Sequence, residues 1–202
     1  MKQILFFSFS IFLSSAAMAE FLPQSFSSKF EQEYVSTLKG KAKKGQGSIE
    51  YKYPGQIRFE TNTPSTVIFA SNGVKAWYYR APFIEGEQGE VTETSAKEGS
   101  TIYIKFFDSL KNGLVSNDYY SVRNGQPSKI IFKAKAEKEL GISEADLSFK
   151  GNGQKFEDLQ LIELTFADGK KSKLKFVDLK TNHNPGADRF NFTPPANTKK
   201  VN

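Results

Sequence analysis

The sequence predicts an α+β fold in which a curled antiparallel β-sheet forms a half-open barrel, with two or three helices as a lid over its concave apolar face. Short runs of alternating apolar and polar residues recur between Gly45 and Phe83, separated by turn signals at Pro54-Gly55, Asn62-Thr63-Pro64 and Asn72-Gly73. Phe, Tyr and Trp make up 14% of the chain, which makes one sheet face strongly apolar. Flanking segments with helical periodicity could cover that face.

The first 19 residues have the pattern of a secretory signal peptide. Lys2 precedes a short apolar run from Ile4 to Leu13, and Ala17-Met18-Ala19 is a small-x-small cleavage site. The apolar run is too short for a permanent membrane span, although an N-terminal anchor is the alternative. We therefore expect residues 20–202 to form a single exported domain of the bacterial envelope. The chain has no Cys, so it cannot be a lipoprotein itself or use disulfides.

The segment from Phe21 to Lys39 is predicted to be the first covering helix. Pro23 would lie in its first turn and Gly40 would follow its end. Large apolar residues recur at every fourth position, at Phe26, Phe30, Tyr34 and Leu38. This spacing predicts an amphipathic helix whose apolar side packs on the sheet.

The alternation in the predicted strands assigns one set of side chains to the concave face. These residues are Ile49, Tyr51, Ile57, Phe59, Phe69, Trp77 and Tyr79. A second helix from Ser100 to Asn112, with Ser100 as its cap and Gly113 as its terminator, would turn Phe106 and Leu110 toward them.

The remaining segments complete the sheet. Ile84 to Gly99 is acidic and reads as a weak edge strand or a loop. Strands are expected at Tyr119–Arg123, Lys129–Lys133, Asp158–Phe166, Lys173–Leu179 and Arg189–Phe192, with a helical turn at Lys135–Leu140 and a frayed tail at Lys199-Lys200. The alternation changes phase near Ile162, which suggests a bulge.

The residues of catalysis and metal binding are scarce. Cys is absent and the single His183 lies in a turn sequence, so neither a nucleophilic triad nor a zinc site is indicated. Basic residues are interspersed with acidic ones despite a net charge of +6, which argues against nucleic-acid binding. We therefore expect a protein that is not an enzyme and has no catalytic residue, cofactor or metal.

Two ordered anchors carry a family resemblance. The first comprises Gly45-Gln46-Gly47, the Pro54 to Phe59 segment, and a hairpin from Ser71-Asn72-Gly73 through Trp77-Tyr78-Tyr79 to Pro82-Phe83. The second is the closing Phe190-Asn191-Phe192-Thr193-Pro194-Pro195. In this order and spacing they resemble the periplasmic outer-membrane lipoprotein carrier proteins, the LolA family.

The resemblance implies a periplasmic chaperone that binds the acyl chains of lipoproteins in its concavity and carries them from the inner to the outer membrane. Its partners would be acylated lipoproteins, an inner-membrane ABC-type exporter and an outer-membrane acceptor, and the chain would act as a monomer. The expected cavity residues are Phe26, Phe30, Ile49, Tyr51, Ile57, Phe59, Phe69, Trp77, Tyr79, Phe106 and Leu110.

The sequence departs from the family at one position linked to the lid. The family commonly has an arginine immediately before the proline of the second strand turn, and Tyr53 precedes Pro54 here. Tyr53 and Arg58 are therefore the candidates for a lid latch, Arg58 as a substitute for the missing arginine.

Three other interpretations stay open from the residues alone. In the first, the aromatic side chains form only the core of a β-rich structural protein, as any helix-covered half-barrel requires. A lipid or lipoprotein sensor could use the same half-barrel. An envelope hydrolase is the alternative from another class, although no nucleophile or carboxylate pair supports it.

Overall fold

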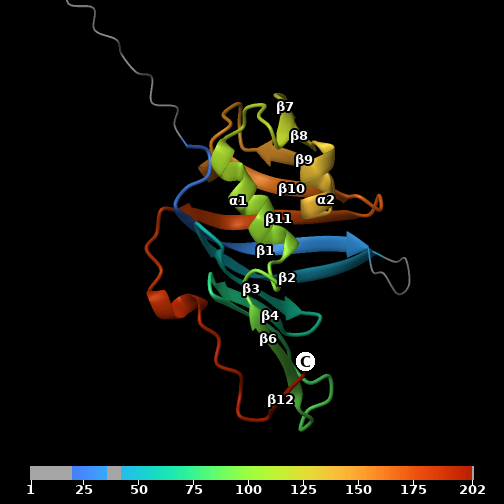
Figure 1. Ribbon diagram of the computed structural model, residues 1–202, viewed down its shortest axis with the longest axis vertical. Helices are drawn as coiled ribbons and strands as arrows, with labels where there is room; N and C mark the ends of the chain where they lie inside the picture. Colours follow the sequence, from blue (N-terminus) through green and yellow to red (C-terminus); the bar gives the residue numbers. More distant parts are fainter. Residues whose placement is uncertain (1–19, 36–41, 202) are drawn as a thin grey trace, which may run out of the picture.

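The computed structural model describes residues 20–35 and 42–201, which fold around one long, curled β-sheet (Figure 1). The predicted signal peptide at residues 1–19 lies outside the described residues. The sheet has twelve strands in the order β12-β6-β5-β4-β3-β2-β1-β11-β10-β9-β8-β7. Neighbouring strands pair antiparallel, except that β12 runs parallel to β6. The predicted α+β fold class is confirmed.

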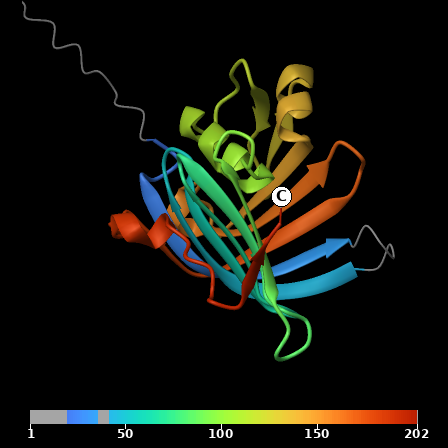
Figure 2. The same cartoon turned by 60° about the horizontal axis from the view of Figure 1, so that its bottom comes forward.

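The strands are mostly short and follow one another closely. They are β1 Ser25–Val35, β2 Ala42–Lys52, β3 Gln56–Thr63, β4 Val67–Asn72, β5 Lys75–Arg80, β6 Gly89–Ser95, β7 Tyr120–Arg123, β8 Ser128–Phe132, β9 Ile142–Phe149, β10 Leu159–Phe166, β11 Lys171–Thr181 and β12 Thr198–Lys200. The sheet curls without closing, so it forms a half-open barrel with a concave and a convex face (Figure 2).

Two α-helices lie within the curl of the sheet, on its concave side (Figures 1 and 2). They are α1 Ile102–Ser109, continued by the 3₁₀ turn η1 Leu110–Asn112, and α2 Ala134–Leu140. Two further 3₁₀ turns, η2 Phe156–Asp158 and η3 Ala187–Phe190, flank the last long strands. The second predicted helix is confirmed, although its N-cap is Thr101 and not Ser100.

The prediction of a first helix from Phe21 to Lys39 is wrong for the residues that the structure describes. Ser25–Val35 is the central strand β1, which pairs with β2 along its whole length and with β11 on its other side. A spacing of four residues is also a multiple of the strand period of two. Ser28 and Gln32 lie on the same face as Phe26, Phe30 and Tyr34. These two polar residues interrupt the apolar–polar alternation that would have predicted a strand.

The C-terminal part of the sheet also differs from expectation. The segment Ile142–Phe149, for which no strand was expected, is β9. Arg189–Phe192 was expected to be a strand, but the chain forms η3 there because its backbone N–H groups bond locally. The expected frayed tail contributes β12, whose Lys200 pairs with Val91 of β6. The phase change in β10 is real, with a register shift between Leu159 and Leu161.

The turn residues behave as their chemistry predicts. Gly73 has a φ of 86° in the hairpin between β4 and β5, and the Asn72 side-chain carbonyl accepts from the N–H groups of Val74 and Lys75. Gly113 and Gly141 end η1 and α2 with positive φ. These positions need glycine because other residues pay a steric cost there.

Gly47 of the Gly45-Gln46-Gly47 motif is required by close packing. A Cβ at this position would lie 1.8 Å from the carbonyl oxygen of Glu60 in β3 and 2.8 Å from the ring of Phe30 in β1. Neither atom can move aside without a cost in free energy, since one is backbone and the other belongs to the packed core.

We predict that Gly47→Ala lowers the free energy of unfolding by about 1–3 kcal/mol or more, as overpacking does elsewhere. Urea denaturation measures this change. Gly186→Ala is the matched control, because its added Cβ would meet nothing within 4 Å and its φ is −56°. Equal unfolding midpoints for the two variants would contradict the packing argument.

Candidate functional site

Nine of the eleven predicted cavity residues come together on the concave side of the sheet. They are Phe26, Phe30, Ile49, Tyr51, Ile57, Phe59, Phe69, Phe106 and Leu110, and all of them belong to one buried apolar cluster. Strands β1 to β4 supply seven of them, whereas α1 and η1 supply Phe106 and Leu110.

Trp77 and Tyr79 belong instead to a second cluster on the convex face, with Ile68, Ala70, Val91 and Phe192. Register explains the correction, because Phe69 faces Tyr78 across the β4–β5 ladder while Ala70 faces Trp77. Side chains alternate along a strand, so Ala76 and Tyr78 are the concave residues of β5. Because residues 77–79 are all aromatic, the sequence pattern does not show which side chains of this strand point to the concave face.

Most of the concave cluster is packed protein interior. Phe26 stacks on Tyr51 with ring centroids 5.2 Å apart and meets Phe107 of α1 edge-on at 5.0 Å. Phe21 and Leu22, just before β1, are buried too, and Phe21 contacts Phe149 and Phe156. At this end of the half-barrel the interpretation of the aromatic residues as a filled core is correct.

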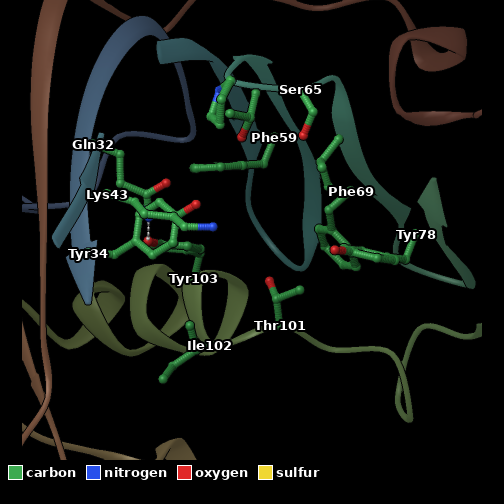
Figure 3. A pocket seen from close by; sticks show the side chains of 13 residues that line it. Gln32, Tyr34, Lys43, Phe59, Ser65, Phe69, Tyr78, Thr101, Ile102 and Tyr103 are labelled. Atoms are coloured by element: carbon green, nitrogen blue, oxygen red, sulfur yellow. Dashed lines mark hydrogen bonds between the residues drawn. The ribbon is translucent and has the colours of Figure 1, made fainter. Parts of the chain in front are cut away.

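An open pocket of about 540 Å³ lies at the other end, around the N-terminal turn of α1 (Figure 3). Its sheet side is formed by Phe59, Val67, Phe69 and Tyr78. Its helix side is formed by the N-cap Thr101 and by Ile102 and Tyr103 of α1. Of the predicted cavity residues only Phe59 and Phe69 line this pocket. Sequence reasoning missed Tyr78 and Tyr103, although the alternation with Ala76 and the position of Tyr103 on the predicted helix were available signals.

A second pocket, also about 540 Å³, lies beyond Tyr103 toward the β10–β11 hairpin and is lined by Phe166, Gly141 and Ser172. A third, smaller one of about 280 Å³ shares Phe69, Tyr78 and Thr101 with the first and reaches Gly99 near β6. Together the three pockets follow the concave face around the start of α1. The helix is thus packed on the core at its C-terminal end and bordered by open space at its N-terminal end.

The C-terminal end of α1 is anchored to the sheet by a carboxylate. Asp108 accepts a hydrogen bond from the Tyr51 hydroxyl at 2.5 Å and another from the backbone N–H of Gly55 at 3.1 Å. Burial of Tyr51, together with this bond to an acidic partner, raises the pKa of its hydroxyl far above the ordinary range. Tyr51 therefore stays a neutral donor.

The two latch candidates occupy different faces. Tyr53 lies against the end of the lid, because the Lys111 ammonium of η1 is 4.9 Å from the centre of its ring and also pairs with Glu20. Arg58 lies on the convex face, where it pairs with Glu60 at 3.2 Å and lies over Phe192 at 5.8 Å. Arg58 therefore contacts the C-terminal segment on the face opposite the helices, and its role as a lid latch stays a prediction.

The remaining chemistry of the described residues is limited. Within residues 20–35 and 42–201 no three His, Cys, Asp or Glu side chains gather as a metal site would require. His183 follows β11, in a turn where its carbonyl accepts from Ser25. Among the helices of this same part of the chain, none has the length and apolarity to cross a bilayer.

The fold and the site define a half-barrel protein whose apolar concavity holds two helices and is open beside the first of them, α1. A family model described as outer membrane lipoprotein carrier protein LolA matches residues 23–193, and the chain belongs to this family. The resemblance found in the sequence motifs is thereby confirmed.

Curated relatives carry the name outer-membrane lipoprotein carrier protein. One from Vibrio vulnificus is 27% identical over 195 residues, covering 91% of both chains, and one from Pseudoalteromonas translucida is 27% identical over 178 residues, covering 85% of this chain and 78% of the relative. Among solved structures, an uncharacterized conserved protein from Thermus thermophilus aligns with a TM-score of 0.49 at 11% identity, over 89% of this chain and 91% of the other. A LolA superfamily protein from Nitrosomonas europaea aligns with a TM-score of 0.41 at 9% identity, over 86% and 92%.

We predict that Asp108→Ala destabilises the protein by about 1–3 kcal/mol, because the buried Tyr51 hydroxyl and the Gly55 N–H lose their acceptor. Hydrogen exchange should then accelerate in α1 and η1 before the sheet. Tyr119 and Glu139 form an exposed phenol–carboxylate pair at 3.4 Å, so Glu139→Ala is the control and should change little. Unchanged protection of α1 in Asp108→Ala would show that this anchor is dispensable.

Alkaline pH provides a second test of the buried hydroxyls. Burial raises the pKa of Tyr51 and Tyr120 above the value of about 10 for an exposed phenol. The unfolded state releases these protons first, so their contribution to stability is complete below pH ~10 and is lost as pH rises beyond it. Ultraviolet titration should show these two tyrosines ionising together with unfolding. Their ionisation near pH ~10 in an intact fold would contradict the assignment.

Proposed function

We propose that this protein is a periplasmic, non-enzymatic carrier that holds the acyl chains of lipoproteins in the concavity beside α1 and moves them from the inner to the outer membrane. The observation that carries the proposal is the coincidence of the family match with open apolar pockets beside the covering helix. Cargo would arrive from an inner-membrane ABC-type exporter, which spends the ATP, and leave to an outer-membrane acceptor.

The physical demand on such a carrier is reversibility. Burying acyl chain from water contributes roughly 0.8 kcal/mol per CH₂. Three chains taken from water would pass the practical ceiling of roughly 18–21 kcal/mol for non-covalent affinity. The relevant exchange is therefore between membrane and cavity, two apolar environments, where the net difference is small and cargo can be released.

The helix α1 is the natural moving part of this mechanism. Its N-terminal turn borders open pockets, whereas Phe106, Phe107 and the Asp108 anchor hold its other end. We infer that cargo enters the pockets around Ile102 and Tyr103. Deeper opening would have to separate Phe107 from Phe26 and Tyr51.

Native mass spectrometry of the protein purified from periplasm tests the proposal directly. We expect a one-to-one soluble complex with an excess of a triacylated lipoprotein and loss of the cargo when membrane vesicles are added. The same lipoprotein without its acyl chains is the control and should not bind. If the acylated form also fails to bind and the protein excludes a hydrophobic dye, the carrier function is wrong and the aromatic residues are core alone.

A further inference from the structure

Tyr103 stands between two apolar pockets of equal size. The first extends along the concave face toward Phe69 and Tyr78, and the second extends toward Phe166 in the β10–β11 hairpin. Each holds about 540 Å³, and the wall they share consists of Gln32, Tyr34, Ile102 and Tyr103. Figure 3 shows the Tyr103 side chain rising from α1 toward Gln32 of β1.

The ring of Tyr103 is fixed on its apolar side by stacking. It lies parallel to Phe59, with ring centroids 5.0 Å apart and an angle of 9° between the planes. Phe59 in turn stacks on Phe30 at 4.4 Å. The partition between the pockets therefore continues directly into the packed core and cannot shift without disturbing it.

The hydroxyl of Tyr103 is fixed by polar neighbours. It accepts a hydrogen bond from the side-chain amide of Gln32 at 2.6 Å and lies 3.4 Å from the Ser172 hydroxyl of β11. The Gln32 amide also reaches Ser172 at 3.3 Å. Two apolar pockets thus meet at a small cluster of hydrogen-bond donors whose members bond to one another.

We propose, resting on the carrier function above, that Tyr103 divides the site into two acyl-chain compartments and that the ligand is a diacylglyceryl group straddling its ring. The two chains of such a group diverge from a branch point that carries ester groups. Esters only accept hydrogen bonds, and the shared wall supplies amide and hydroxyl donors where the chains must separate. Gln32 and Ser172 are then positioning residues, because they hold the Tyr103 hydroxyl at the branch point.

The test compares two synthetic lipopeptides of the same sequence, one with an S-diacylglyceryl group and one with a single N-linked palmitoyl chain. Tyr103→Phe keeps the partition but removes the hydroxyl. We expect this variant to weaken binding of the diacylglyceryl peptide about three- to tenfold, the worth of one hydrogen bond, with little change for the single-chain peptide. Ser172→Ala should shift the same ratio in the same direction. Tyr119→Phe, which removes an exposed hydroxyl away from the pockets, should leave both affinities unchanged.

The ratio of the two affinities separates the possible failures. If the wild-type protein binds both peptides and Tyr103→Phe changes them equally or not at all, the compartment proposal is overturned and the carrier function stands. If the wild-type protein binds neither peptide, the carrier function itself fails. Urea denaturation of Tyr103→Phe, set beside that of Tyr119→Phe, establishes that the comparison is made on folded proteins.

Discussion

The packing of Phe26 is the contact on which the rest of the half-barrel depends. This fully buried ring of the central strand β1 meets Tyr51 of β2, Phe107 of α1, Phe156 of η2 and Phe176 of β11, at centroid distances from 4.9 to 6.3 Å. The two halves of the sheet meet at β1, so one side chain joins both halves to the covering helix. Aromatic pairs at such distances add about 0.5–1.5 kcal/mol each beyond area burial.

That contact also divides the concave side into two regions with different roles. Around Phe26 the protein fills its own interior, and the Asp108 carboxylate adds a polar anchor at the same end of α1. Around Tyr103 the interior gives way to pockets. One end of α1 is therefore packed into the interior through Phe107, whereas Tyr103 at the other end is held by Phe59 beside open space.

The sequence was sufficient for the fold class, for most strands of the sheet and for the family, but not for strands β1, β9 and β12 or for the faces of β5. Strands β2 to β4 alternate cleanly, so Ile49, Tyr51, Ile57 and Phe59 could be assigned to the concave face. In β5 both faces carry aromatic rings, and only the register with β4 reveals that Trp77 is convex. Its cover, Phe192, comes from far along the chain. The polar residues Ser28 and Gln32 made the local pattern of β1 suit a helix. Pairing with the neighbouring strands determines that this segment is a strand.

The contacts of Gln32 explain why a polar residue lies on the concave face of β1. A strand that only contributed to a core would gain from an apolar side chain at this position, since a buried polar group costs free energy unless it finds partners. Gln32 finds them in Tyr103 and Ser172, at the rim where the packed interior ends. The polar position that made β1 resemble a helix is thus the one that holds the partition of the proposed lipid site.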